Sequence, residues 1–267
     1  MAKIANESRE LLASKSEPYK NEINKLLDKE KNILNLIAKD SSGVAYKRLL
    51  LAEDMIYIST IYMTINNLSV EIILAKNTDA LNEARKTLYK AIIYLEEIVT
   101  NIIDAPFSEY EDKLQQISNI PLEKRYFIVR KLGLAIRLLM DAYGENTKWK
   151  WAFVELNGRF AVVAKNMLDM KVVSKTYFDP RSQDYDTTIY FVRLVRKLIA
   201  QSADQYRDRY ELATRRIDDM RNALLFLSAQ RRFCIILNEK DESEDLKKKG
   251  QVWKDKLEND RKKGIAQ

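Results

Sequence analysis

The sequence contains no histidine and only one cysteine among its 267 residues, and both shortages restrict its chemistry. Without histidine, the chain lacks the commonest general base, the commonest metal ligand and any Ser-His or Cys-His nucleophile pair. Cys234 alone allows neither an intramolecular disulfide nor a cysteine metal cluster. We therefore expect a protein that is not an enzyme and that holds no cofactor or metal ion.

Glycine and proline are also scarce, with six and four residues respectively. Because these two residues interrupt regular structure most strongly, their scarcity predicts few breaks and long helices. Long apolar runs are missing as well, since Asn66, Asn67 and Glu71 interrupt the most apolar stretch before it reaches the roughly 18 residues needed to span a bilayer. The first ten residues have no apolar core typical of a secretory signal. These features predict an all-α protein in the cytoplasm.

The net charge of +7 is unevenly distributed along the chain. Residues 1–120 carry 15 basic and 18 acidic side chains, whereas residues 121–238 carry 22 basic and 13 acidic ones. The type of cation changes too, from mostly lysine in the first segment to mostly arginine between residues 181 and 238. Since the planar guanidinium pairs with carboxylates and phosphates in two-point contacts, the arginines indicate specific ionic contacts rather than general solubility.

Apolar spacing and capping residues predict a multi-helix bundle over residues 16–180, preceded by a flexible N-terminus at residues 1–15. Ser16 and Pro18 are typical of a helix start. The clearest pattern begins near Asp79, where Leu81, Leu88, Leu95 and Ile102 repeat every seven residues. With the helices that follow, we expect about six or seven in all.

Residues 147–175 have two competing interpretations. Apolar residues from Trp149 to Met170 recur at steps of three and four, which indicates a helix. The pair Asn157-Gly158, however, lies between apolar flanks and is a strong β-hairpin signal. We favour the helix because the periodicity covers seven positions, and Gly158 then marks a helix crossing or a weak point in that helix.

The segment at residues 181–238 predicts one very long, coiled-coil-like C-terminal helix from Asp186 to Asn238, about 80 Å long at 1.5 Å per residue. Its apolar residues form a single stripe. They are Val192, Val195, Ile199, Ala203, Tyr206, Tyr210, Ala213, Ile217, Met220, Leu224 and Leu227. Such a helix must pack against the bundle or against a partner, including a second copy of the chain. A charged tail follows at residues 239–267, either disordered or a poorly packed helix.

The first candidate binding site is a basic stretch with interleaved aromatic residues. Cations beside rings suit single-stranded nucleic acid or an anionic membrane surface, although the simpler interpretation places Phe127, Leu134 and Leu138 in the core and the cations in solvent. Trp151 lies outside the core stripe, which indicates a contact surface. The residues expected to contact a partner here are Arg125, Arg130, Lys131, Trp149, Lys150 and Trp151.

The second candidate site is the arginine-rich face of the predicted long helix. Most of its arginines have acids three or four residues away, as in Arg207–Glu211, Glu211–Arg215, Arg215–Asp219 and Asp218–Arg221, and such pairs are usual on an exposed helix. The cations without local acids lie toward the two ends. These expected partner-binding residues are Arg193, Arg196, Lys197, Arg231 and Arg232.

Together these patterns predict a non-catalytic structural, scaffolding or regulatory protein that acts through helix-mediated protein–protein interaction. The alternative is a nucleic-acid-binding helical protein that uses the basic region at residues 121–238, because that region has a net charge of +9. The two hypotheses predict different dependence on salt and on partner proteins.

Overall fold

The protein is all-α, as the composition predicts. The computed structural model describes residues 6–145, 147 and 149–266, and these form ten α-helices, one 3-10 helix and one π-helical segment, with no β-strand. The helices are more numerous than the six or seven expected. None of the described helices is both long and apolar enough to cross a membrane. The chain divides into two compact units, which are described separately below.

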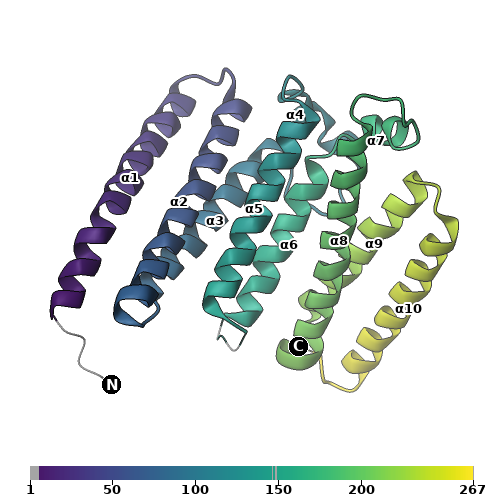
Figure 1. Ribbon diagram of the computed structural model, residues 1–267. Helices are drawn as coiled ribbons and strands as arrows, with labels where there is room; N and C mark the ends of the chain where they lie inside the picture. The colour runs from purple at the N-terminus through teal and green to yellow at the C-terminus, as the bar shows by residue number, and fades with distance from the viewer. Residues whose placement is uncertain (1–5, 146, 148, 267) are drawn as a thin grey trace. The chain divides into compact units, whose positions relative to one another are not determined.

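Unit 1 comprises residues 1–98 and 130–147. It contains α1 (Asn6–Lys39), α2 (Val44–Ile73), α3 (Thr78–Ile98) and the later turns of α5 (Leu122–Tyr143) (Figure 1). The helix α1 begins at Asn6 and runs through Pro18, so residues 6–15 are helical rather than flexible and Ser16 does not cap a helix start.

The pairing of α2 with α3 forms the core of unit 1. Leu81, Leu88 and Leu95 are at most 1% exposed, which confirms the seven-residue repeat up to that point. Ile102 lies beyond the end of α3 and is 55% exposed, so the repeat does not extend to it. Buried residues occur on most faces of α2, as its apolar composition predicts for a central helix.

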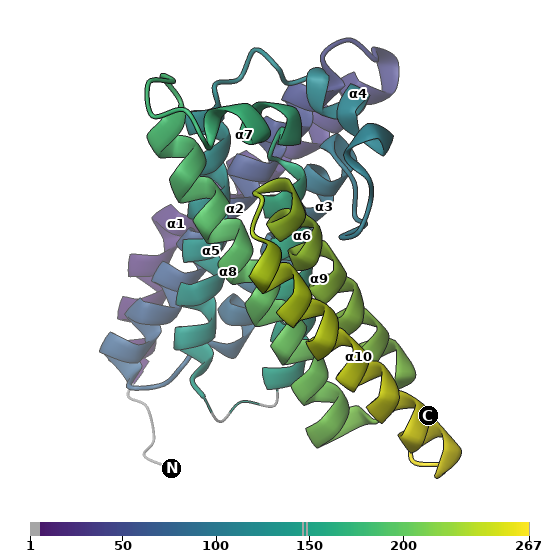
Figure 2. The ribbon, with the colours of Figure 1, turned by 90° about the vertical axis from the view of Figure 1, so that its right-hand side faces the viewer.

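Unit 2 comprises residues 99–129 and 148–267. Its smaller elements are the 3-10 helix η1 (Phe107–Glu109), α4 (Glu111–Gln115), the first turns of α5 and α7 (Met170–Thr176). Its longer helices are α6 (Lys150–Asn166), α8 (Tyr185–Arg209), α9 (Ile217–Ile236) and α10 (Lys240–Lys262). Contacts join α6 to α8, α8 to α9 and α9 to α10. Figure 2 shows α8, α9 and α10 side by side.

The prediction of one long helix from Asp186 to Asn238 is wrong. The chain leaves α8 through the π-helical segment η2 (Tyr210–Thr214), and Arg215 then takes a left-handed conformation with φ of 53° before α9 begins. Most of the apolar stripe is buried because α8 folds back on α9. Val195 and Ile199 are buried on one helix and Met220 and Leu227 on the other, whereas Ala213 in the turn is exposed. Three-and-four spacing identifies a buried face, and it does not distinguish one helix from two that pack on each other.

The helical interpretation of residues 147–175 is confirmed in part. The helix α6 runs uninterrupted through Asn157 and Gly158, so these residues form no hairpin. A Cβ added at Gly158 would lie 2.6 Å from Cε2 of Tyr206, and glycine is therefore required where α8 crosses α6. The helix ends at Asn166, and the Asp169 side chain caps the separate helix α7.

The charged segment after Asn238 forms α10. Of its apolar side chains, Leu246, Trp253 and Leu257 are buried. They recur at spacings of seven and four, so they lie on one face of the helix. The tail is therefore an ordered helix from Lys240 to Lys262.

Candidate partner-binding surface

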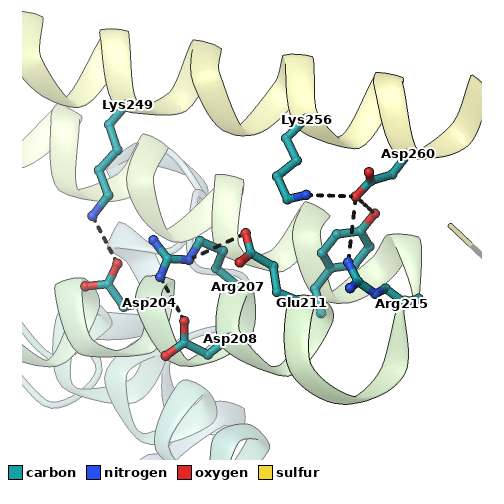
Figure 3. A network of polar contacts seen from close by, with 9 residues as sticks. Asp204, Arg207, Asp208, Glu211, Arg215, Lys249, Lys256 and Asp260 are labelled. Carbon is teal, nitrogen blue, oxygen red and sulfur yellow. Dashed lines mark hydrogen bonds and ion pairs between the residues drawn. The ribbon is translucent and has the colours of Figure 1, made fainter. Parts of the chain in front are cut away.

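Most of the arginines in the middle of the predicted long helix form ion pairs within unit 2, and Figure 3 shows those of Arg207 and Arg215. The predicted pairs Arg207–Glu211 and Asp218–Arg221 are present, at 4.0 and 3.2 Å. Arg215 pairs instead with Asp260 of α10, at 3.9 Å. These contacts leave few free cations along this part of the chain.

The turn between α8 and α9 is held by the buried carboxylate of Asp219. It accepts hydrogen bonds from the Arg209 guanidinium and, at 2.5 Å, from the hydroxyl of Thr214. Asp219 is in the first turn of α9, where the positive end of the helix dipole also stabilises its charge. This network, which joins residues five and ten positions apart, ends α8 without a glycine or a proline.

Polar contacts also attach α10 to α8 and to η2 (Figure 3). Lys249 donates to Asp204 at 3.0 Å, and the hydroxyl of Tyr210 donates to Asp260 at 2.9 Å. Burial alone would raise the pKa of Asp260, but hydrogen bonds from Tyr210 and Lys256 hold that pKa below its usual value. The charged form of this carboxylate is thus favoured in the folded protein.

The structure separates the expected partner-binding cations into paired and unpaired groups. Arg196 binds Glu239 at 2.8 Å and Glu242 at 2.6 Å, while Arg232 binds Asp104 at 2.9 Å. Arg231 is half-buried, and its Nε atom is buried without a hydrogen-bond partner. Arg193 and Lys197 are exposed and form no ion pair with any residue that the structure describes.

The basic residues of α5 include one buried and two exposed cations. Arg125 is buried and its Nη1 atom lies 3.5 Å from the carbonyl oxygen of Met167, so it is not a surface cation. Burial lowers the pKa of Arg125, and the charges of Asp169 and Asp184 partly offset that effect. In unit 1, Arg130 is exposed, and Lys131 pairs with Glu53 at 3.2 Å on the surface.

The two tryptophans at the start of α6 are half-buried rather than exposed. The carbonyl oxygen of Trp151 accepts a hydrogen bond from Arg209 at 3.2 Å. The ammonium of Lys150 lies 5.1 Å from the centroid of the Trp151 ring. Trp149 immediately precedes the helix and is also half-buried. These contacts use part of the surface that the sequence assigned to a partner.

A different surface forms where the start of α5 meets the start of α8. The rings of Tyr126 and Phe191 lie 5.3 Å apart, and both helices run in the same direction from this end of unit 2 (Figure 1). Because successive helical residues differ by about 100°, Phe127 and Tyr190 turn to the same side of this contact. They are 44% and 55% exposed.

Unpaired cations lie beside these two rings. Arg193 and Lys197 follow Tyr190 by three and seven residues and therefore share its face of α8, while Lys124 precedes Phe127 by three residues on α5. We name this set the α5–α8 surface, and it consists of Lys124, Phe127, Tyr190, Arg193 and Lys197. The sequence identified Arg193 and Lys197, but core packing was the simpler interpretation of Phe127, and its ring is exposed.

One cluster in unit 2 has the composition of a metal site. Ligand atoms of Cys234, Glu239 and Glu242 lie within 4.8 Å of one another. However, Arg196 bonds to both carboxylates, and burial together with the charge of Glu242 raises the pKa of the Cys234 thiol to about 11. A protonated thiol beside two neutralised carboxylates is a poor set of metal ligands.

Two buried charged groups, Lys165 and Glu30, also hold local structure. In unit 2, Lys165 donates to the carbonyl oxygen of Ala105 at 3.1 Å, and burial lowers its pKa to about 8. In unit 1, Lys90 bonds at 2.9 Å to the buried carboxylate of Glu30, which also accepts from Tyr94. The sequence analysis did not identify these groups, because their partners lie about 60 residues away along the chain.

Comparison with known proteins adds a family but no described relative. No curated protein and no solved structure matches the chain. A family match covers residues 8–261, which is nearly the whole sequence and includes all of the surface residues described above. The chain belongs to the TP0443 family.

Proposed function

We propose that the protein is a non-catalytic scaffolding or regulatory protein that binds another protein through the α5–α8 surface. The observation that carries this proposal is the Tyr126–Phe191 contact, because helix geometry then turns the exposed rings of Phe127 and Tyr190 to the same side of it. Aromatic rings and arginine are the residue types that most often contribute strongly to binding between proteins. Arg193 completes such a set beside Tyr190.

The geometry favours this face over the apolar stripe that first indicated a partner. Most of that stripe is buried within unit 2, so it offers no continuous apolar face to a second copy of the chain. The nucleic-acid alternative has less support, because Arg125 is buried and Arg196, Arg209, Arg215 and Arg232 are each bound to carboxylates. Phosphate binding depends on several cations that release counterions together.

The proposal is tested by photo-crosslinking of the full chain in its native cells. A benzophenone amino acid replaces Tyr190 in one variant and Val252 in a control, because Val252 is 64% exposed on α10 of the same unit. We expect a discrete protein adduct from position 190 and none of that size from position 252. Equal labelling at both positions, or adducts to nucleic acid alone, would contradict the proposal.

A further inference from the structure

Two neighbouring cations on α8 repel each other. Arg193 and Lys197 are four residues apart on the exposed face, and like charges at this spacing destabilise a helix. The other three cations of this helix, Arg196, Arg207 and Arg209, each bind a carboxylate. The pair at 193 and 197 is thus the part of α8 where positive charge is left without an acid.

The acids on the same side of the two helices do not neutralise this pair. Glu123 and Asp186 lie in the first turns of α5 and α8, where the positive ends of the helix dipoles stabilise negative charge. Arg193 lies two turns further along α8 than Asp186, and Lys197 lies about one turn beyond Arg193. The exposed surface therefore changes from acidic at the helix starts to basic beside Tyr190.

We propose that the α5–α8 surface binds an acidic amphipathic segment of a partner protein, an inference that rests on the proposed function. Its carboxylates pair with Arg193 and Lys197, and its apolar side chains cover Phe127 and Tyr190. The two cations are about 6 Å apart along the helix axis, at 1.5 Å per residue. A partner helix that carries acids three or four residues apart matches this spacing. The guanidinium of Arg193 gives a two-point contact with one of them.

The number of free cations favours a protein segment over the other polyanions. Proteins whose affinity for duplex DNA depends strongly on salt typically make about 6–10 contacts with phosphates. Recognition of an anionic membrane typically uses about 4–8 clustered lysines or arginines. On this face, the cations without an ion pair in the described structure are Lys124, Arg193 and Lys197. Three cations are enough to pair with the two carboxylates of a partner segment whose apolar side chains cover the neighbouring rings.

The test reverses the charges of the pair in the full chain that carries the crosslinker at position 190. The variant is Arg193→Glu with Lys197→Glu. Its matched control is Lys247→Glu with Lys248→Glu, an exposed adjacent pair on α10 that changes the net charge equally. Because like charges placed across an interface repel each other, we expect adduct yield to fall about tenfold or more in the first variant and to stay unchanged in the control.

Two further measurements complete the test. The crosslinked partner segment, sequenced by mass spectrometry, is expected to be acidic, and replacing its acids with lysine should restore the adduct of the charge-reversed variant. The neutral variant Arg193→Gln with Lys197→Gln is expected to fold at least as stably as the native chain, which excludes unfolding as the cause of lost binding. Its adduct yield should lie between those of the native and charge-reversed chains.

The outcomes separate this inference from the function on which it rests. A protein adduct at position 190 that survives charge reversal, or a crosslinked segment that is not acidic, overturns the inference and leaves the proposed function standing. Failure to form any protein adduct overturns both. Binding of a single-stranded oligonucleotide or of phosphatidylserine vesicles that requires Arg193 and Lys197, with no protein adduct, assigns the surface to that polyanion instead.

Discussion

In unit 1, α3 packs on α2 through a row of fully buried apolar side chains, whereas in unit 2, α10 is attached through three apolar side chains and several ion pairs. The charges follow the same division. Unit 1 has 17 basic and 16 acidic residues, and unit 2 has 29 and 23. Similar helical sequences are thus stabilised in two ways. Apolar burial dominates between α2 and α3, where Arg48 and Glu97 add one ion pair, and it responds little to salt and pH. Ion pairs have a larger share in the attachment of α10, and they respond to both.

The largest loss of stability is expected when a buried apolar side chain between α2 and α3 in unit 1 is removed. Leu88→Ala removes a fully buried side chain of α3, and the cavity should lower the free energy of unfolding by about 2–5 kcal/mol. Chemical denaturation followed by circular dichroism measures this change. Ile93→Ala, at a position that is 41% exposed on the same helix, is the control and should cost far less. Equal losses would show that the α2–α3 contact does not dominate the stability of unit 1.

The second effect concerns close packing within unit 2. Gly158→Ala should destabilise the protein by about 1–3 kcal/mol, because the new methyl group overlaps the Tyr206 ring, which stacks on Phe226. Gly250→Ala on α10 meets no atom within 4 Å and should stabilise the protein by about 0.5–1 kcal/mol. The unfolding temperature should therefore fall in Gly158→Ala and rise in Gly250→Ala, as thermal unfolding of both variants would measure. A stabilising Gly158→Ala would contradict the close approach of α8 to α6.

A third prediction is that high salt loosens α10 in unit 2 but not α3 in unit 1. Raising the salt to about 1 M shortens the screening length to about 3 Å and weakens the partly exposed pairs, such as Lys249–Asp204, that attach α10. Cys234 is fully buried close to Glu242 of α10, so we expect its reaction with a thiol reagent to accelerate several-fold. Hydrogen exchange of α3 is the internal control and should not change. An unchanged thiol rate would show that the apolar side chains alone hold α10.

The smallest effect is a dependence on acid in the attachment of α10 within unit 2. The pKa of Asp260 is lowered in the folded protein, so its contribution to stability is complete above the unfolded value of about 3.9 and is lost as the pH falls through the folded value. Asp260→Asn should therefore lower the unfolding temperature at pH 7, and the difference from the native chain should narrow toward pH 3. A constant difference across this range would contradict the role of the charged form.

The sequence predicted what depends on local spacing. The repeat of Leu81, Leu88 and Leu95 identified a core helix, and of the two interpretations left open for Gly158, a helix crossing or a weak point, the structure shows the crossing. It failed where the partner of a side chain lies far along the chain. Asp260 pairs with Arg215 across 45 positions, and no spacing rule connects them. The same limitation made the charged segment after Asn238 look like a tail.

The amino-acid sequence alone indicates a protein built from helices with apolar stripes, because a chain with so little glycine and proline and so many helix-forming residues favours long helices. What covers each stripe depends on the tertiary contacts. The predicted long helix is two helices that pack on each other, and most arginines of that segment form ion pairs. Burial and pairing depend on contacts distant in sequence, and these contacts alone left Arg193 and Lys197 unpaired beside two exposed rings.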